Sequence, residues 1–430
     1  GGTGNDTLIG GPGNNSLRGG PGTDNFDCGL EVDKVLDFNI SEGDMVSPSC
    51  LMDPGNRKVI KPQEEPTIIN DTSLLVETVI TGLHRPTNIA FLGANDILVL
   101  EKNNGTVQRI INGTMLPNPL LDVDVVANDG LLGIAVSKNE SGSTYVFLYF
   151  TESSTKRDQT STEFVEEGKR IDPAGNRLYR YELRNDALVN PKLLLDLPAL
   201  PGPIHNGGEI IIGPDNVLYV TVGDMEGYSK AYSSTKAQNF RDGPEPDGRS
   251  GILRVTQDGK PIGNGILGDK FPLNLYYSYG LRSSFGIDFD PVSGTLWDTE
   301  NGPDFGDEIN LVEPGFNSGW QMVQGLWKPE GGLAGHIALI PDDLVDFDGK
   351  GKYSAPEFIW HYTVAPTALK FLDSDKLGKR YQNDMFVGDV NYGRIYHFGL
   401  TNDRTELALN GALADRIANS TNELQDVIFG

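Results

Sequence analysis

The sequence predicts an all-β protein, a β-propeller preceded by a short parallel β-roll. Strand–turn–strand patterns recur five times between Asn88 and Leu400, which is typical of propeller blades. No segment keeps an apolar period of 3.6 residues, so we expect helices to be minor. The first 27 residues repeat every nine, a period that builds a parallel roll.

The N-terminal repeats read GGTGNDTLI, GGPGNNSLR and GGPGTDNFD. Glycines permit the tight turns of a roll, and Asp6 and Asp24 offer the hard oxygen ligands that calcium prefers. One apolar side chain per copy is expected to point inward, namely Leu8, Leu17 and Phe26. The stretch resembles the RTX repeats of secreted bacterial and archaeal proteins. That resemblance implies calcium binding and an extracellular or cell-surface protein.

Two segments separate these repeats from the propeller. We interpret Val32–Val46 as a strand-like cap on the roll, and residues 51–72, rich in Pro, Glu, Lys and Asn, as a linker. The predicted domains are therefore residues 1–50, the linker 51–72, and residues 73–430. Cys28 and Cys50 both lie in the first domain, where a disulfide is preferred and two free thiols are the alternative.

The propeller prediction depends on a repeated unit of short strands joined by turns with Gly, Asp or Asn. The five copies begin at Asn88, Gly130, Pro201, Ser284 and Thr367. After the fifth, only Leu424–Gly430 remains, with the pattern of the first strand of a sixth unit. We therefore expect the last blade to be incomplete in this chain. A form extended by about 30–40 residues, roughly one blade, should be more stable.

The charge and the ends of the chain restrict its partners. The formal net charge of −25 at pH 7 argues against nucleic acid, which requires a basic face. No apolar run is long enough to span a membrane. The chain has no starting Met and no signal-peptide core, so we expect a processed or excised part of a longer protein. Eight sequons would make a secreted chain a glycoprotein: Asn5, Asn14, Asn39, Asn70, Asn104, Asn112, Asn139 and Asn419.

The stretch Pro201–Asp224 combines a hairpin with a candidate active site. Glu209–Ile212 and Val217–Thr221 are rich in β-branched residues and are separated by Gly-Pro-Asp-Asn, which predicts a β-hairpin. Because a hairpin brings its ends together, His205 and Asp224 should lie within hydrogen-bonding distance. A carboxylate that fixes the tautomer of a histidine makes it a better general base. A turn histidine beside a turn-capping aspartate is the alternative.

Three further stretches accompany this motif: Tyr279–Trp320, with YGLRSS and ENGPDFGDEINL, Asn128–Val136 (NDGLLGIAV) and Val364–Phe371 (VAPTALKF). With GLHRPTNIAF they resemble the glucose/sorbosone dehydrogenase family, which includes soluble quinoprotein aldose sugar dehydrogenases. The resemblance covers Leu75 to Gly430. It implies a six-bladed propeller that carries calcium and pyrroloquinoline quinone (PQQ) over its channel.

The resemblance also implies roles for single residues. His205 corresponds to the catalytic base, Asp224 to the carboxylate that orients it, and Arg282 to the arginine that faces the quinone. Gly302 and Pro303 correspond to the loop whose backbone carbonyls hold the cofactor calcium. The implied function is a secreted, PQQ-dependent dehydrogenase that oxidises the anomeric carbon of an aldose and passes electrons to an external acceptor.

The sequence departs from the family where PQQ carboxylates are held. At those positions Asn391 stands in place of a lysine, and Glu423 and Gln425 in place of two arginines. Elsewhere Asn128 stands in place of a glutamine that contacts the cofactor, and Ser283 in place of the asparagine that follows the arginine. We therefore expect PQQ to bind more weakly than in the family, and the triple change to Lys, Arg and Arg to tighten it. The alternative function is a calcium-dependent carbohydrate- or protein-binding propeller that has lost the quinone.

Other residues have structural interpretations. We expect Asp307 and Glu308 to accept backbone hydrogen bonds at a blade corner. Trp320 and Trp327 are interpreted as packing between blades, with stacking on a sugar as the alternative. Packing or surface positions are expected for His84, His336, His361 and His397. A lactonase-like hydrolase is less favoured, because no carboxylate cluster for a channel metal is recognisable.

Overall fold

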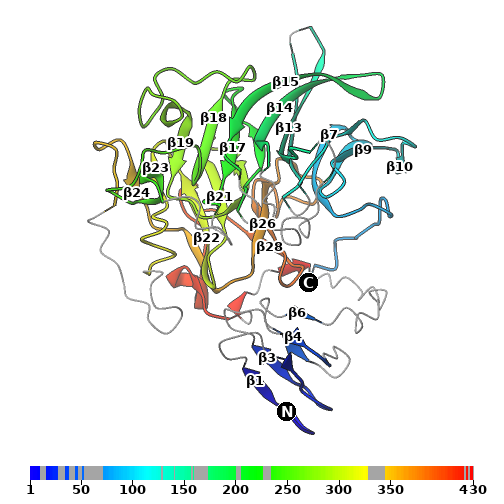
Figure 1. Cartoon of the computed structure of the whole chain (residues 1–430), viewed down its shortest axis with the longest axis vertical. Coiled ribbons are helices and arrows are strands. Elements are labelled where there is room, and N and C mark those ends of the chain that lie inside the picture. Colours follow the sequence, from blue (N-terminus) through cyan, green and yellow to red (C-terminus); the bar gives the residue numbers. More distant parts are fainter. Residues whose placement is uncertain are drawn as a thin grey trace. The chain divides into compact units, whose positions relative to one another are not determined.

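The computed structural model consists of two compact units, Gly1–Thr67 and Ile68–Gly430. It describes residues 1–9, 16–27, 34–37, 44–46, 51–52, 71–126, 129–139, 141–155, 158, 173–199, 205–225, 234–327, 344–420, 423–424 and 427–429. Both units are built from strands, so the all-β prediction is confirmed (Figure 1). The helices formed by the described residues are three short 3-10 helices: η4 (Lys236–Gln238), η5 (Leu273–Leu275) and η7 (Gly411–Asp415). None of them has the length and apolar character needed to cross a membrane.

The first unit contains two sheets of short parallel strands. One sheet consists of β1 (Thr7–Ile9), β3 (Asn25–Asp27) and β5 (Met45–Val46), and the other of β2 (Ser16–Leu17), β4 (Lys34–Val35) and β6 (Leu51–Met52). Thr7 pairs with Asn25 and Ser16 with Lys34, so successive nonapeptides alternate between the sheets. The segment interpreted as a cap supplies β4 and β5, and β6 lies at the start of the expected linker. Cys28, Cys50 and linker residues 53–70 lie outside the described residues.

The inside of the first unit is formed by one side chain from each repeat. Phe26 and Val35 are buried, and Leu8 and Leu17 pack against them, as the nine-residue period predicts. Gly20 has a positive φ of 103°, and a Cβ there would lie 2.0 Å from the carbonyl oxygen of Gly2. The close stacking of repeats therefore requires glycine at this position.

Asp24 has the features of a calcium ligand in this unit. Its side chain is only 1% exposed. Its Oδ1 accepts a hydrogen bond from the backbone N–H of Asp6 at 2.9 Å, whereas its Oδ2 has no partner among the described residues. Asp6 Oδ2 accepts from the N–H of Gly2 at 2.7 Å. A buried carboxylate oxygen without a donor suits a hard cation, so the residues at Asp24 fit calcium.

We expect millimolar calcium to order the first unit. The few carboxylates present and the small core predict weak binding, in the range of extracellular calcium modules. Circular dichroism of residues 1–67 should show increased β-structure on calcium addition, and Asp24→Asn should weaken that response. The control uses the full-length protein, in which limited proteolysis reports how calcium orders the N-terminal region. There Asp348→Asn, which changes an exposed aspartate of the second unit, should leave the calcium response unchanged. An unchanged spectrum at millimolar calcium would contradict the assignment.

The described residues of the second unit form five sheets, each with a four-stranded antiparallel part. The first has β7 (Pro86–Gly93), β8 (Asp96–Glu101), β9 (Thr106–Ile111) and β10 (Thr114–Met115); the second β12 (Leu131–Lys138), β13 (Thr144–Glu152), β14 (Gly175–Arg184) and β15 (Ala187–Leu197); the third β16 (Ile210–Ile212), β17 (Leu218–Val222), β18 (Gly251–Val255) and β19 (Tyr276–Tyr279). The fourth has β20 (Ser284–Phe289), β21 (Leu296–Glu300), β22 (Phe305–Val312) and β25 (Phe358–Tyr362); the fifth β26 (Pro366–Phe371), β27 (Met385–Asp389), β28 (Ile395–Phe398) and β30 (Val427–Phe429). These sheets correspond to the five predicted repeats.

Short strands extend three of these sheets: β11 (Leu121–Asp122) on the first, β23 (Phe316–Asn317) and β24 (Lys352–Tyr353) on the third, and β29 (Ile417–Ala418) on the fourth. The C-terminal segment differs from its prediction. Instead of opening a sixth unit, β30 pairs with β28, with Phe429 opposite Ile395. Antiparallel pairing with the open edge of β28 satisfies backbone groups that would otherwise be exposed.

The first strands of the five sheets meet at a common centre. Each of β7, β12, β16, β20 and β26 contacts the next in this order. Asn88 Nδ2 donates to Glu209 Oε2 at 2.6 Å, and Lys370 Nζ lies 3.8 Å from Glu209 Oε1 and from Asp288 Oδ1. Asn88, Asp288 and Lys370 lie on the first, fourth and fifth sheets, and Glu209 directly precedes β16 of the third. In each antiparallel sheet, the segment before the first strand and the segment after the second strand lie at the same end of this centre. The candidate site, with His205 before β16 and Asp224 after β17, lies at that end.

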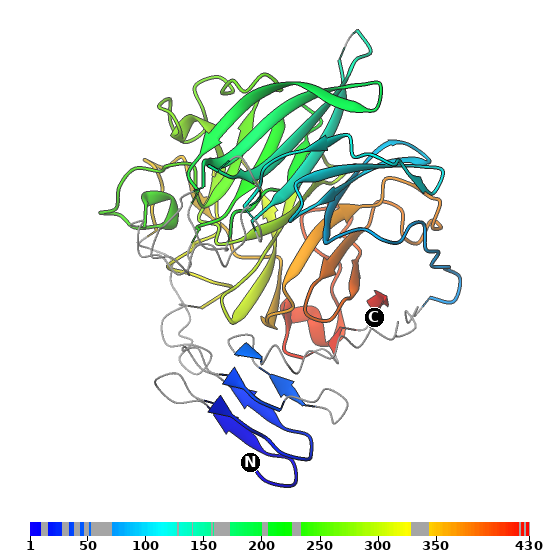
Figure 2. The ribbon, with the colours of Figure 1, turned by 45° about the vertical axis from the view of Figure 1, so that its right-hand side comes forward.

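Consecutive sheets of the second unit lie side by side (Figure 2), and apolar side chains pack them together. Leu98 and Leu148 join the first and second sheets, and Trp297 and Leu369 join the fourth and fifth.

In the described part of the chain, the outer face of the first sheet is not covered in this way. Phe91 is 61% exposed and lines an apolar groove of about 800 Å³. The described residues leave this face uncovered.

Glu209 makes the central cluster sensitive to pH. Its side chain is 10% exposed, and burial raises its pKa to about 7, with the nearby Lys370 limiting the rise. Because the folded-state pKa exceeds the ordinary 4.5, its stabilising contribution is complete below about pH 4.5 and is lost as the pH rises through 7.

Replacing Glu209 with Gln should therefore raise the melting temperature at pH 8 and leave it unchanged near pH 4.5. The glutamine oxygen can still accept from Asn88, while the cost of ionising a buried carboxyl disappears. We expect a gain of about 1–3 kcal/mol in the free energy of unfolding at pH 8, measured as a shift of a few degrees. Glu313→Gln, at an exposed position, should show no such difference. A loss of stability at pH 8 would show that the charge of Glu209 is required.

Candidate active site

The predicted hairpin positions His205 and Asp224. Strands β16 and β17 pair antiparallel, with Ile210 opposite Val220. His205 Nδ1 lies 2.6 Å from Asp224 Oδ1, so the expected hydrogen bond is present. The histidine side chain is 10% exposed and the aspartate is fully buried. A Cβ at Gly223 would lie 2.1 Å from the carbonyl oxygen of His205, so this close approach requires glycine.

Arg282 lies against the same pair. The backbone N–H of Asp224 donates to the carbonyl of Arg282 at 2.8 Å. The guanidinium Nη1 donates to the carbonyls of Asn301 at 2.8 Å and Gly302 at 2.7 Å. The backbone N–H of Arg282 donates to Glu300 Oε1 at 2.5 Å. The structure thus brings together the base, the orienting carboxylate, the arginine and the calcium loop that the resemblance indicates.

The Gly302–Pro303 loop is fixed by Asp307. Asp307 Oδ1 accepts from the N–H of Gly302 at 2.8 Å, and Oδ2 accepts from Val364 at 2.6 Å and Ala365 at 2.8 Å. Burial raises the pKa of Asp307 to about 6, and the three backbone donors limit the rise. Pro303 is exposed. The interpretation of Asp307 as an acceptor of backbone hydrogen bonds is confirmed.

Asn391 lies one loop away from Gly302. It follows β27 and is exposed. Its N–H donates to the carbonyl of Val364 at 3.2 Å, and its Nδ2 to the carbonyl of Thr363 at 3.1 Å. Because Val364 also bonds to Asp307, which holds the N–H of Gly302, the structure places Asn391 beside the Gly302–Pro303 loop. Asn128, the other predicted cofactor contact, lies outside the described residues.

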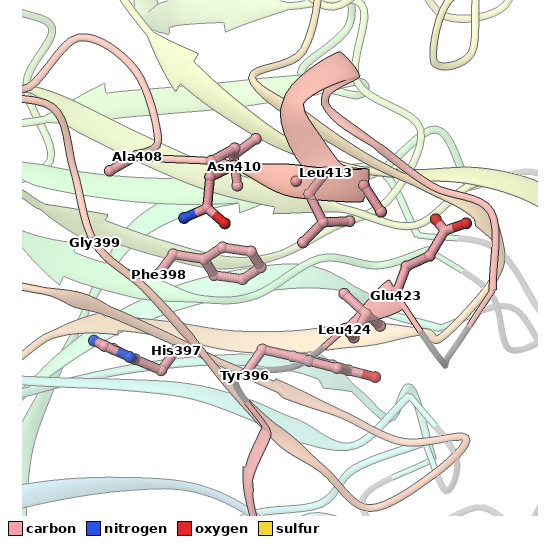
Figure 3. Close-up of a pocket in the computed structure, with 12 residues that line it drawn as sticks. Tyr396, His397, Phe398, Gly399, Ala408, Asn410, Leu413, Glu423 and Leu424 are labelled. Carbon is pink, nitrogen blue, oxygen red and sulfur yellow. The ribbon is translucent and has the colours of Figure 1, made fainter.

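Glu423 lies apart from these contacts. Its Oε2 accepts from the N–H of Asn419 at 2.7 Å. Figure 3 shows Glu423 in a pocket of the fifth sheet, with Tyr396, Leu413 and Leu424. Gln425, the second position where the family has an arginine, is outside the described residues.

Trp320 contacts both the carboxylate and the arginine. Its indole Nε1 donates to Asp224 Oδ2 at 2.7 Å, and its ring centroid lies 5.5 Å from the guanidinium carbon of Arg282. The interpretation of Trp320 as interblade packing did not include these contacts. Asp224 lies 96 residues away along the chain, and no spacing pattern in the sequence joins the two.

A pair of buried glutamates lies behind Arg282. Glu300 and Glu308 are directly opposite each other on β21 and β22, and Ser318 Oγ contacts both carboxylates, at 2.6 and 3.2 Å. Burial raises the pKa of Glu308 to about 8, and burial together with the charge of Glu308 raises that of Glu300 well above its usual range. The N–H of Gly325 donates to Glu308, as expected for an acceptor of backbone bonds. Burial and the closeness of the two carboxyls therefore both favour the protonated form of the pair.

Residues 83–423 match the family model described as Glucose / Sorbosone dehydrogenase. The chain belongs to the glucose/sorbosone dehydrogenase family. Residues 1–34 match the RTX calcium-binding nonapeptide repeat. Such repeats are typical of secreted proteins.

Relatives in the glucose/sorbosone dehydrogenase family include named sugar dehydrogenases. Quinoprotein glucose dehydrogenase B of Acinetobacter calcoaceticus is 28% identical over 277 residues, which cover 60% of this chain and 54% of that protein. Aldose sugar dehydrogenase YliI of Escherichia coli K12 is 26% identical over 340 residues, covering 76% and 81%. The PQQ-bound aldose sugar dehydrogenase of Streptomyces coelicolor has a TM-score of 0.56 and 25% identity, covering 78% and 83%. The all-β fold thus matches the propeller-type structures of the family.

The residues present fit the calcium and quinone of the family better than its PQQ carboxylates. The carbonyl oxygens of Asn301 and Gly302 both accept a hydrogen bond from one nitrogen of Arg282, so the two oxygens converge on one point. Carbonyl oxygens are hard ligands of the kind that calcium prefers. Calcium bound there would share these carbonyls with Arg282 or displace it. Besides Arg282, Lys102 offers a positive charge. It follows β8, at the end of the first sheet where the candidate site lies, and burial lowers its pKa. Asn391 supplies no charge.

Proposed function

We propose that the protein is a secreted sugar dehydrogenase that oxidises the anomeric carbon of an aldose, with PQQ and calcium as cofactors and an external electron acceptor. The observation that carries this proposal is the 2.6 Å contact between His205 and buried Asp224, with Arg282 bonded to Asp224 through the backbone. The sugar dehydrogenase names of the relatives support it.

His205 is the general base in this proposal. Asp224 Oδ1 accepts a hydrogen bond from the protonated Nδ1, which leaves Nε2 as the basic nitrogen. Nε2 has no hydrogen-bond partner among the described residues. Nε2 takes the proton of the anomeric hydroxyl, and Asp224 stabilises the imidazolium that forms. PQQ, when bound, supplies the acceptor for the hydride that leaves the sugar carbon. Arg282 and the carbonyls of Asn301 and Gly302 would hold the quinone oxygens and calcium, and the arginine stabilises negative charge.

The finer architecture belongs to the same proposal. We propose that the second unit belongs to a six-bladed propeller and that its five sheets are five of the six blades. For the first unit we propose a calcium-binding β-roll. The uncovered apolar face of the first sheet supports the former, because propeller blades pack on both faces. The parallel strands and the buried Asp24 oxygen support the latter. The RTX repeats support secretion.

A binding propeller without quinone is the second candidate function. The observation that favours it is the neutral, exposed Asn391 beside the Gly302–Pro303 loop. A PQQ trianion gains little there without a cation. In this candidate function the site around His205 and Arg282 would bind a carbohydrate or a protein without oxidising it.

The experiment that tests the proposal is reconstitution of the purified protein with PQQ and calcium. Aldose-dependent reduction of a dye should appear, should require both additions, and should be lost in His205→Gln. Saturating PQQ without any aldose oxidation would favour the binding propeller.

A further inference from the structure

We infer that Trp320 is a positioning residue that fixes Asp224 in the orientation His205 requires. This inference rests on the proposed function, in which His205 is the general base. Trp320, on a loop of the fourth repeat, would thereby influence the protonation of His205, on the third repeat.

Asp224 is held by one ring N–H on each carboxylate oxygen. His205 Nδ1 is 2.6 Å from Oδ1, and Trp320 Nε1 donates to Oδ2 at 2.7 Å. The carboxylate is fully buried. An indole N–H can only donate, so Trp320 cannot compete for the proton that His205 and Asp224 share. Oδ2 is thereby fixed and Oδ1 is directed at the histidine.

Trp320 is itself held in place by its backbone. Its N–H donates to the carbonyl of Gly280 at 2.9 Å, and its carbonyl accepts from Asn239 Nδ2 at 2.9 Å. Asn239 and Asn317 exchange two side-chain hydrogen bonds, at 2.8 and 3.0 Å. With the side chain 6% exposed, the indole has little freedom to follow a moving carboxylate. It acts as a fixed donor.

Two other tryptophans show that packing alone does not require this hydrogen bond. Trp297 and Trp360 are 0% and 1% exposed. Neither indole Nε1 has a hydrogen-bond partner among the described residues. In this fold a buried tryptophan is therefore tolerated without a partner, and the bond from Trp320 to Asp224 is a specific feature.

Loss of the indole donor should make Asp224 more basic. The carboxylate would then hold the shared proton more strongly, and His205 would stay protonated to higher pH. Among the described residues, the other charged groups facing the pair are Arg282 and Arg249, whose Nη1 lies 3.3 Å from the carbonyl oxygen of Asp224. Asp247 pairs with Arg249. A change of Trp320 to Phe leaves all of them in place and keeps a ring beside Arg282.

The test compares Trp320→Phe with Trp360→Phe, which removes an indole N–H that has no hydrogen-bond partner in the part of the chain that the structure describes. Side-chain NMR of the five histidines gives the His205 titration in the protein without cofactor, assigned by the signal lost in His205→Gln. We expect the midpoint to rise by about half to one pH unit in Trp320→Phe only. In the reconstituted enzyme kcat should fall about tenfold, with its acid limb moved the same way and KM little changed.

An unchanged His205 midpoint in folded Trp320→Phe would overturn the inference. If that variant does not fold, the parent protein decides. One of its four indole N–H signals should titrate with His205 and lose this titration in His205→Gln; four signals that ignore His205 would refute the inference. Because the NMR experiment needs no turnover, failure to oxidise any aldose would refute the proposed function and leave the role of Trp320 measurable.

Discussion

His205→Gln is expected to lower kcat for aldose oxidation by about 10²–10⁴-fold, the range a positioned general base contributes. Glutamine can still bond to Asp224, so the hairpin ends stay together, but it cannot accept the proton of the anomeric hydroxyl. PQQ affinity should change little, because the arginine and the calcium loop are untouched. Steady-state dye reduction and a PQQ titration measure the two effects separately.

His397→Gln is the matched control for this experiment. His397 Nε2 also lies close to an aspartate, 2.9 Å from Asp384 Oδ2. Its ring packs against Tyr381 and Phe386 in the fifth sheet, away from the contacts of the calcium loop. We expect kcat to change less than about threefold in the folded variant. Equal losses in the two variants would mean that His205 acts through stability and not through chemistry.

The contrast between these two pairs shows what the sequence could predict. A hairpin signal around Gly213–Asn216 brings His205 and Asp224 to one rim by geometry alone, and the structure confirms their hydrogen bond. The interpretation of His397 as a packing residue also agrees with its aromatic contacts. Local turn chemistry was sufficient for His205 and Asp224, because both lie beside a short-range strand pairing.

Contacts between distant segments could not be predicted in this way. The outer strands β15, β19 and β25 complete their sheets through residues that the repeat pattern did not single out. The facing of Glu300 and Glu308 depends on the register of β21 and β22, and a slip of one residue would turn each side chain to the other face. Trp320 reaches Asp224 through the packing of two repeats, which no single-segment pattern encodes.

The anion-binding side of the site gives the second large effect, in the opposite direction. Asn391→Lys is expected to tighten PQQ binding about ten- to hundredfold. Asn391 is exposed beside Val364, which shares Asp307 with Gly302. A lysine there can reach a carboxylate of a cofactor held at the Gly302 carbonyl. A charge-assisted hydrogen bond contributes about 1.5–3 kcal/mol, and about 1.4 kcal/mol corresponds to a factor of ten.

Glu423→Lys supplies the control, because it adds positive charge in the pocket beside Tyr396 and Leu413. PQQ titrations at one calcium concentration and one ionic strength should show a change below about threefold for this variant. If both lysines tighten binding equally, the effect comes from the net charge of −25, and higher salt should abolish it. If only Asn391→Lys tightens binding and aldose oxidation rises with it, the parent is a dehydrogenase with a weakened cofactor site. Tighter binding without any oxidation would instead favour the propeller that binds its ligand and leaves it unchanged.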